Sequence, residues 1–369
     1  MTGRKIGGGS IFHSYLAKWI AVEHLERFSN STITEISQAY AGIYSSRPTS
    51  WLALMARNGN VKRDEAIAME TDPGLVRIPG MRRSKFLLPH TLASKVFGAT
   101  RLPLASHEWR LTEAGLTLDD YQRILPDLIE FTRCSPVQQK DIGYALGLVG
   151  SQIRACTTVA TYQGVIIRTP PANPWSSRWL YVAAPDSLLS FEDKPSNREQ
   201  LLREIACRYI EHYGPVTVGD LAWWLGVSKG NARLYIEGAG AYEIGAEMWI
   251  SASKRDRFQQ YISCADQHSG AEVRFLPAWD PLVMGYAPGS MQRDCLGLNQ
   301  IGGYDSAGNG RPVVMIGARA VATWRTIAKG GNRSIWIDLS QVSDHEQKIL
   351  KEAASVWTNR IGTLQYQEN

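Results

Sequence analysis

The feature that most constrains this chain is an internal repeat in its middle third. Two stretches align without a gap, one beginning at Pro136 and the other at Pro215. The matched pairs share one separation along the chain: they are Asp141 with Asp220, Ile142 with Leu221, Leu146 with Leu225, Gly147 with Gly226, and Arg154 with Arg233. A repeat of this kind indicates two tandem copies of one supersecondary unit.

Each copy follows the pattern of a helix-turn-helix. An apolar stretch with a period of about 3.6 residues ends at Leu-Gly, and a second helical stretch follows the turn. We expect Gly147 and Gly226 to take the left-handed conformation, in which a Cβ would clash. The segments TYQGVIIR and AYEIGAEMWIS come next, and each predicts a two-stranded wing with Gly in its hairpin. These signals are typical of winged-helix units.

A third, weaker copy lies near the N-terminus, in TITEISQAYAGIYSSRPTSWLALMAR. Its Glu35 corresponds to the aspartate of the other copies, with one extra residue before Gly42. The alignment places residues 44–46 just after the turn, at the start of a second helix. Ser46 is a candidate N-cap of that helix, and Pro48 suits its first turn.

The last third of the chain predicts strands. EVRFLPAWDPLVMGYAPGS, GRPVVMIGARAVATWRTI and RSIWIDLS alternate apolar and polar residues between turns. A closing helix follows Ser343, a candidate N-cap, while the Pro-rich stretch from Arg168 to Trp179 predicts a loop. The predicted fold class is α+β, with tandem winged-helix repeats and a C-terminal β-rich domain. The predicted parts are a flexible N-terminus (1–11), three winged-helix units (12–125, 126–190 and 191–262) and the C-terminal domain (263–369).

Composition excludes several classes of protein. Hydrophobic residues make up 44% of the chain and charged residues 20%, as in soluble globular proteins. No apolar run reaches the roughly 18 residues of a membrane helix, and the start lacks a signal peptide. We therefore expect a cytoplasmic protein with no membrane partner. The five scattered cysteines and seven histidines lack metal-ligand spacing, so we expect reduced, buried thiols, no metal and no cofactor.

Three sequence blocks, in order, resemble one family. LVRIPGMRRSKFLLP, GPVTVGDLAWWLGVSKGNAR, and RFLPAWDPLVMGY followed by VVMIGARAVATWR resemble the AlkZ-type winged-helix DNA glycosylases. The resemblance runs from about Phe12 to about Leu364, and the Leu-Pro-Ala-aromatic-Asp-Pro block is its most specific part. It implies tandem winged helices and a β-rich domain around a basic cleft for duplex DNA. Such enzymes remove alkylated or cross-linked purines, and relatives act as self-resistance factors beside genotoxin biosynthesis genes.

The resemblance fails at the family's catalytic motif. The family places Gln-hydrophobic-Gln or Gln-hydrophobic-Asp directly after the first turn glycine, where this chain has Tyr44, Ser45 and Ser46. Breaking an N-glycosidic bond leaves an oxocarbenium-like sugar, so a polar side chain must position water and support that charge. The family's Gly-Thr-x-His is also absent after Met-Arg, where Arg83, Ser84, Lys85 and Phe86 stand.

The sequence nevertheless yields candidate residues for each role. The candidate catalytic residues are Tyr44 and Ser46, although capping and packing of the turn is the favoured interpretation over catalysis. Cleft or ligand-binding candidates are Trp51, Arg77, Arg82, Arg83, Lys85 and Asp280. For Asp280, a buried carboxylate that holds backbone amides is the favoured interpretation over general-base catalysis. The nucleic-acid-binding candidates Lys229, Asn231 and Arg233 lie at the start of a predicted recognition helix.

Three functions stay open at this point. The first is an AlkZ-like DNA glycosylase or lesion-binding relative with a divergent active-site turn. The second is an AlkZ-type fold redirected to a small molecule in natural-product biosynthesis, with the ligand in the same cleft. The third is a non-catalytic DNA-binding protein. The formal net charge of +5 is compatible with double-stranded DNA as a partner but does not require it.

Overall fold

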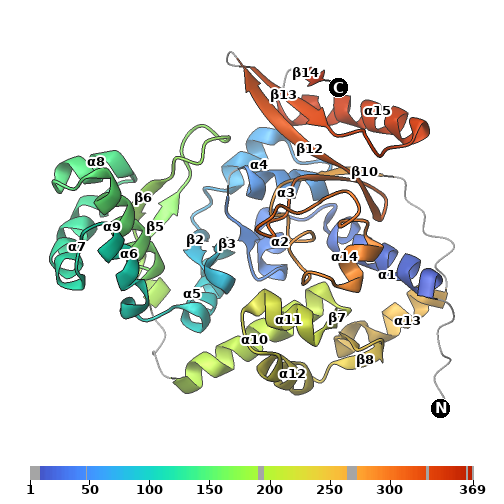
Figure 1. Cartoon of the computed structure of the whole chain (residues 1–369), viewed down its shortest axis with the longest axis horizontal. Helices are drawn as coiled ribbons and strands as arrows, with labels where there is room; N and C mark the ends of the chain where they lie inside the picture. Colours follow the sequence, from blue (N-terminus) through green and yellow to red (C-terminus); the bar gives the residue numbers. More distant parts are fainter. Residues whose placement is uncertain are drawn as a thin grey trace. The chain divides into compact units, whose positions relative to one another are not determined.

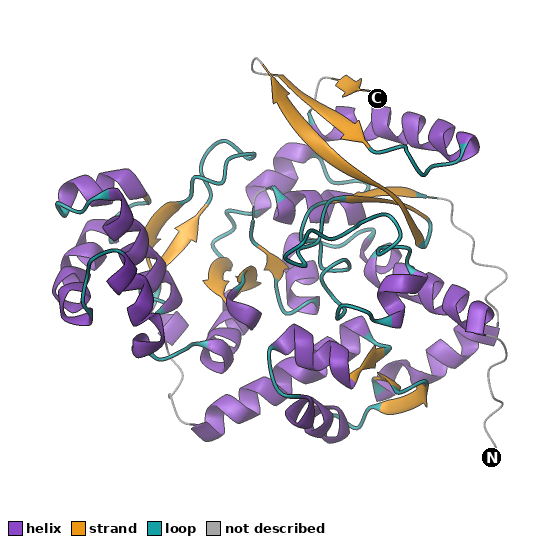
Figure 2. Cartoon of the chain, in the orientation of Figure 1, coloured by secondary structure: helices purple, strands orange, loops and turns teal. Residues whose placement is uncertain are grey.

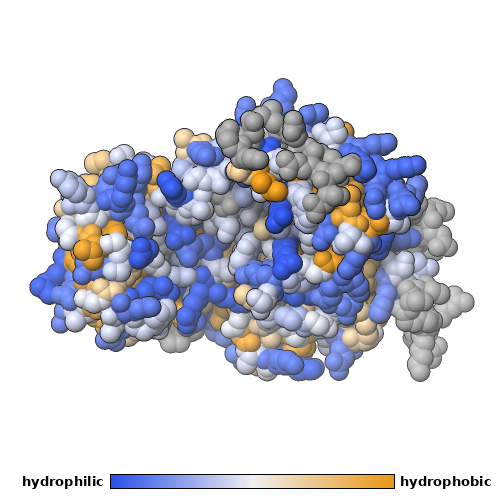
Figure 3. Space-filling model, turned by 45° about the horizontal axis from the view of Figure 1, so that its top comes forward, coloured by the Kyte–Doolittle hydropathy of each residue, from blue (hydrophilic) through white to orange (hydrophobic). Residues whose placement is uncertain are grey.

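A computed structural model describes most of the chain. The described residues are 9–46, 48–189, 195–263, 272–329, 332–362 and 365–367. The predicted flexible N-terminus lies mostly outside these residues, and its last residues begin helix α1 (Gly9–His24). No described helix is long and apolar enough to cross a membrane. On the face drawn in Figure 3, hydrophilic side chains dominate and apolar groups form small, separate patches.

The chain divides into two compact units, and neither is continuous in sequence (Figure 1). The first unit comprises Met1–Tyr40, Trp51–Ala66 and Ala206–Asn369, and the second comprises Ala41–Ser50 and Ile67–Ile205. The boundary between the two units falls inside helices α3 (Thr49–Arg57), α4 (Arg63–Met69) and α10 (Pro195–Tyr213).

The second unit contains two three-stranded sheets, with strand orders β1-β3-β2 and β4-β6-β5. Its strands are β1 (Ile43–Tyr44), β2 (Leu75–Pro79), β3 (Lys85–Pro89), β4 (Val137–Gln138), β5 (Ile166–Thr169) and β6 (Leu180–Ala183). Its α-helices are α5 (His90–Thr100), α6 (Glu108–Glu113), α7 (Leu118–Thr132), α8 (Gln139–Ala145) and α9 (Gly150–Tyr162). Its 3-10 turns are η2 (Met81–Arg83), η3 (Leu104–His107) and η4 (Asp186–Leu189).

The first unit holds the remaining helices and two more sheets (Figure 2). Its helices are α1, α2 (Ile33–Ala39), α11 (Val218–Leu225), α12 (Lys229–Gly238), α13 (Arg255–Ser263), α14 (Met291–Cys295) and α15 (Asp344–Ile361), with 3-10 turns η1 (Glu26–Phe28) and η5 (Ala252–Lys254). Strands β7 (Val216–Thr217), β9 (Met248–Ile250) and β8 (Tyr242–Gly245) form a small sheet in that order. The five-stranded sheet comprises β10 (Val273–Leu276), β11 (Val313–Ile316), β12 (Arg319–Lys329), β13 (Asn332–Ile337) and β14 (Gln365–Gln367).

Both repeat copies form the predicted helix-turn-helix. Gly147 and Gly226 follow α8 and α11 with φ of 64° and 77°, which confirms the left-handed turns. In each copy the second helix is followed by a sheet: β8 and β9 form the predicted hairpin, whereas β5 pairs with β6 across the Pro-rich loop. The prediction of a hairpin inside TYQGVIIR is therefore wrong. Assignment of these units as winged helices stays a prediction.

The third copy departs from the predicted pattern after its turn. Gly42 has a φ of 114°, and a Cβ there would lie 2.8 Å from Phe86 Cβ. The chain then forms the short strand β1, in which Ile43 pairs with Leu87 and Tyr44 pairs with Phe86. Because β3 binds this segment through backbone hydrogen bonds, helix α3 begins only at Thr49. The predicted helix start at residues 44–46 is wrong.

The C-terminal strand predictions hold in part. β10, β11, β12 and β13 lie in the stretches predicted as strands, but residues 277–290 form turns and bends, so the strand prediction is wrong there. Ser343 caps α15, and its hydroxyl accepts a hydrogen bond from the Glu346 amide.

The prediction of buried thiols is only partly right: Cys156 is buried, whereas Cys134 and Cys207 are exposed. Cys264 lies outside the described residues.

A buried ion pair organises the core of the first unit. Arg57 donates to both carboxylate oxygens of Asp280, with Nη1–Oδ2 and Nη2–Oδ1 distances of 2.8 Å. Both side chains are fully buried. Arg57 Nε also donates to the His24 carbonyl at 2.9 Å, and Asp280 Oδ1 accepts from the Leu282 amide at 2.9 Å. The backbone-amide contact favoured for Asp280 is present, and the pair joins α1, α3 and the loop after β10.

We predict that Asp280→Asn lowers the free energy of unfolding by about 3–5 kcal/mol, because it leaves the Arg57 charge buried without its counter-ion. Urea unfolding followed by circular dichroism measures the loss. Glu204→Gln is the control, since it breaks the half-exposed pair of Lys95 with Glu204 (Nζ–Oε2 2.8 Å), and it should cost far less. Equal losses in both variants would contradict the structural role of the Arg57–Asp280 pair.

Candidate functional site

The turn residue Tyr44 is part of the core of the second unit. Its side chain is 3% exposed, and its ring packs on Phe86 with a centroid distance of 4.6 Å. The hydroxyl accepts a hydrogen bond from Arg82 Nη2 at 2.8 Å. Burial raises the pKa of this hydroxyl, and the Arg82 charge only partly opposes that shift. Tyr44 is thus a neutral, packed side chain rather than a group exposed to water.

The two serines of the turn differ in exposure. Ser45 is buried, and its amide donates to the Lys85 carbonyl at 2.9 Å. Ser46 is exposed, and its carbonyl accepts from the Thr49 amide at 2.8 Å where α3 begins. Ser46 is therefore the member of the Tyr-Ser-Ser motif whose side chain reaches solvent.

A strained hairpin loop supplies the arginine that holds Tyr44. Strands β2 and β3 pair antiparallel, and Pro79 lies opposite Lys85 in their register. Between them, Arg82 and Arg83 have φ of 52° and 60°, a conformation unfavourable for residues other than glycine. Such strain persists where surrounding contacts enforce it, and it commonly marks functional loops.

Lys85 begins β3 and reaches toward the end of α9. Its Nζ donates to the Tyr162 hydroxyl at 3.2 Å and lies 4.6 Å from the centre of that ring. The Tyr162 hydroxyl in turn donates to the Arg83 carbonyl at 2.9 Å. The His107 ring stacks on the Tyr162 ring, with 5.3 Å between the two ring centres. The ammonium group is thus held by an aromatic residue and not by a carboxylate.

Five side chains around Tyr162 form what we call the cation cluster: Arg83, Lys85, His107, Arg110 and Arg168. Burial lowers the pKa of Lys85 to about 8, and the positive charges of Arg168 and Arg110 contribute to that shift. Burial also lowers the pKa of His107, with Arg83 and Arg110 adding to the effect. Arg110 and Arg168 therefore lie within electrostatic reach of Lys85, and Arg83 and Arg110 within reach of His107.

The basic side chains of the cation cluster lack ion-pair partners among the residues that the structure describes. None of its five members forms an ion pair there. Buried nitrogen atoms of three members, His107 Nε2, Arg110 Nε and Arg168 Nε, also have no hydrogen-bond partner. Donors and charges left unsatisfied in this way are costly, and an anionic ligand would satisfy both.

The remaining cleft candidates are buried. Arg77 is 4% exposed; its Nη1 donates to the Glu70 carbonyl at 2.9 Å, and its guanidinium lies over Trp179. Trp51 and Asp280 are fully buried and belong to the first unit. Of the six candidates, Arg82 contacts Tyr44, whereas Arg83 and Lys85 contact Tyr162, so the structure does not gather all six in one exposed site.

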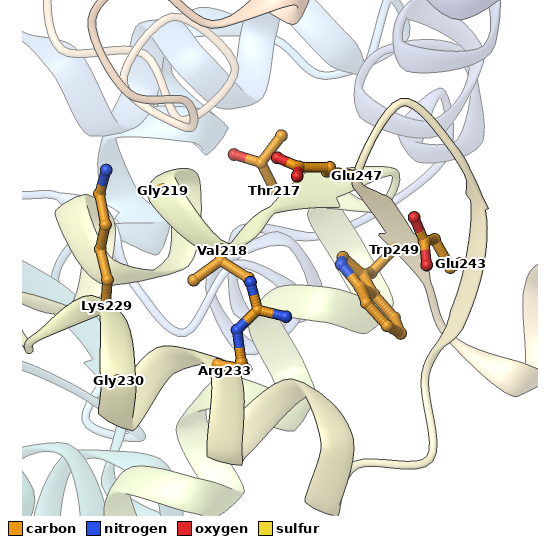
Figure 4. A pocket seen from close by; sticks show the side chains of 9 residues that line it. All are labelled: Thr217, Val218, Gly219, Lys229, Gly230, Arg233, Glu243, Glu247 and Trp249. Atoms are coloured by element: carbon orange, nitrogen blue, oxygen red, sulfur yellow. The ribbon is translucent and has the colours of Figure 1, made fainter.

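The nucleic-acid-binding candidates lie at the exposed start of α12. Lys229, Asn231 and Arg233 are all exposed, and Ser228 caps the helix by accepting from the Asn231 amide at 3.2 Å. Lys229 and Arg233 line a surface pocket of about 600 Å³ (Figure 4). The other residues that line the pocket are Thr217, Val218, Gly219, Gly230, Glu243, Glu247 and Trp249. The two glutamates give this pocket mixed charge, unlike the cation cluster.

Sequence reasoning missed Tyr162, His107, Arg110 and Arg168. Both Tyr162 and Arg168 lie in the segment predicted as a wing, whereas in the structure Tyr162 ends α9 and Arg168 lies in β5. Their contacts with Lys85 join segments far apart in the chain, and no local pattern indicates them. No group of side chains suited to a metal ion was found among the described residues.

Helix-turn-helix elements together with clustered positive charge are typical of nucleic-acid-binding proteins. A family model described as DNA glycosylase AlkZ-like matches residues 41–358. Because this match covers most of the chain, the chain belongs to the AlkZ-like family.

Among solved structures, the Streptomyces sahachiroi DNA glycosylase AlkZ is similar to this chain. The TM-score is 0.67 at 15% sequence identity, and the match covers 96% of this chain and 98% of that one. At this identity the likeness establishes a shared fold. No curated protein sequence matches the chain. The family and the fold together make this a DNA glycosylase-like protein.

We predict that Tyr44→Phe lowers the free energy of unfolding by about 1 kcal/mol, because it removes one buried hydrogen bond and keeps the ring packing. Tyr44→Ala should cost about 3–5 kcal/mol, since it also leaves a cavity against Phe86. Chemical denaturation measures both values. If Tyr44→Phe keeps full stability but loses an activity on DNA, the hydroxyl has a catalytic role and the structural assignment is wrong.

Proposed function

We propose that this protein binds duplex DNA carrying an alkylated or cross-linked purine and releases that base, with the cation cluster contacting the phosphates beside the Tyr-Ser-Ser turn. The observation that supports this is the uncompensated positive charge of the cluster in a member of a DNA glycosylase-like family. Phosphate oxygens would satisfy its unpaired donors and offset the mutual repulsion of its cations.

The proposed chemistry depends on the charge of the damaged base. Alkylation at N7 makes the purine cationic, so it leaves C1′ as a neutral base with the electrons of the glycosidic bond. The enzyme has to position water and support the oxocarbenium-like sugar. We assign this role to the exposed Ser46 hydroxyl, which can hold the water, and not to Tyr44, whose side chain is packed in the core. A hydroxyl supports positive charge less well than a carboxylate does, so we propose that excision is slow.

The helix α12 supplies a second proposed contact with DNA. Lys229 and Arg233 are exposed near its N-terminus, where partial positive charge from the helix adds to that of the side chains. We propose that these residues and Asn231 bind phosphates or base edges of duplex DNA. The family match favours DNA over a small molecule as the ligand. We further propose, as the resemblance implies, that the protein acts in the cytoplasm and protects its host from a DNA-alkylating agent that the host itself makes.

We predict that the purified protein releases the modified base from a duplex containing N7-alkylguanine. Ser46→Ala should slow release roughly tenfold or less, the effect of one lost hydrogen bond to a neutral group. Base release is measured by chromatography of the freed purine under single-turnover conditions. Ser340→Ala replaces another exposed serine and should leave the rate unchanged.

Two results would contradict this proposal. If the wild-type protein binds the duplex but releases no base, it is a lesion-binding protein without glycosylase activity. If Ser46→Ala and Ser340→Ala both match the wild-type rate, Ser46 does not hold the attacking water, and another group of the protein performs that step.

A further inference from the structure

Lys85 differs in its surroundings from other amines of the chain. Lys254 is buried and its Nζ lies 2.6 Å from Glu23 Oε2, and Lys95 pairs with Glu204 at the surface. Each of these ammonium groups is neutralised by a carboxylate. Lys85 is half-buried, and its Nζ donates a hydrogen bond to the Tyr162 hydroxyl. A lysine without an acidic partner is a candidate for chemistry that needs the neutral amine.

The strand that carries Lys85 is hydrogen-bonded to the candidate active-site turn. The Lys85 carbonyl accepts the Ser45 amide at 2.9 Å, so the strand that carries it is bonded directly to the Tyr-Ser-Ser motif. The neighbouring Phe86 packs against Tyr44 on one face of the sheet. Because successive side chains alternate between faces, Lys85 points to the opposite face, toward Tyr162.

The hydrogen bonds of Tyr162 leave the amine nucleophilic. The phenol O–H donates to the Arg83 carbonyl, so its oxygen accepts a hydrogen from Lys85 Nζ. An amine that donates one hydrogen keeps its lone pair when it is neutral. Burial and the charges of Arg168 and Arg110 lower the pKa of Lys85 to about 8, so roughly a tenth of the amine is neutral at pH 7.

We propose that Lys85 is a nucleophile that forms an imine with C1′ of an abasic nucleotide and cleaves the DNA strand there. This inference rests on the proposed function, because an abasic site is the product of base release. The proposed reaction sequence has two steps: the protein first releases the damaged base, and it then cleaves the strand at the abasic site that this release creates.

The step balances without an oxidant or reductant. The neutral amine of Lys85 attacks the C1′ aldehyde of the ring-opened sugar, and the carbonyl oxygen takes one proton from the amine and a second from the solvent. Water then leaves, and a protonated imine remains. The C2′ proton passes to water, the C3′–O3′ bond breaks, and the 3′ phosphate departs with the electron pair. Hydrolysis of the imine returns the free amine. Arg83, Arg110 and Arg168 are placed to bind the phosphates on either side of the abasic sugar.

Borohydride trapping on a preformed abasic duplex tests the proposal. Reduction of the imine gives a stable protein–DNA adduct that migrates slowly on a denaturing gel, and peptide mass mapping should place it on Lys85 in the wild-type protein. Lys85→Arg keeps the positive charge but removes the nucleophile, so the adduct should disappear while the duplex still binds. Lys95→Arg is the matched control and should trap as the wild type does.

An adduct on any other amine, or no adduct at all, overturns the proposal. The mapping uses the unaltered protein, so its result does not depend on whether a Lys85 variant folds. The abasic duplex contains no base to remove, so trapping is independent of base release. Base release without trapping leaves the glycosylase function standing, and trapping without base release leaves the lyase step standing.

Discussion

The buried pair of Arg57 and Asp280 is the interaction on which the first unit depends. Its bidentate geometry uses both terminal nitrogens of the guanidinium and both oxygens of the carboxylate, so neither charge is left unpaired in the core. The aspartate belongs to the sequence block most specific to the family, PAWDP, and the arginine ends α3. The motif therefore reflects an architectural need, and the Asp280 carboxylate is fully engaged by structural contacts.

The second unit has the opposite electrostatic character around Tyr162. Burial, together with neighbouring positive charges, lowers the pKa of Lys85 and of His107, and no carboxylate of the described residues forms an ion pair with the cluster. Folding such an arrangement costs free energy, which is offset elsewhere in the unit by apolar packing such as that of Phe86 and Tyr44. Sites that accept this cost are commonly built for a negatively charged ligand. Burial, with a smaller contribution from the charges of Arg168 and Arg110, also lowers the pKa of Lys85 toward the range in which the amine becomes neutral.

The sequence predicted many of the helices, turns and strands, but it did not predict the contacts between segments that are far apart in the chain. Gly147 and Gly226 could be placed in left-handed turns because the Leu-Gly pattern is local. Of the two tryptophans in α11, Trp224 is fully buried, as expected for a helix with one apolar face. Strand β1 was missed because two residues carry no periodicity and pair only with a strand much later in the chain.

Only part of the candidate site could be predicted, because local motifs are visible in the sequence and contacts between distant segments are not. The resemblance to the family pointed to residues 44–46 and to the basic stretch from Arg82 to Lys85. It did not indicate that Tyr44 would be packed in the core, since burial depends on Phe86 and Arg82 across the sheet. Nor did it indicate that Tyr162 would join Lys85 to His107, because those contacts form only in three dimensions.

The role of the cation cluster is tested most directly by the salt dependence of duplex DNA binding, measured by fluorescence anisotropy for the wild type and for Arg110→Gln and Arg168→Gln. If the cation cluster binds phosphates, each substitution should weaken binding and reduce the slope of log affinity against log salt by about one. Unchanged slopes in both variants, with the duplex still bound, would contradict the assignment of the cluster as the DNA-binding site.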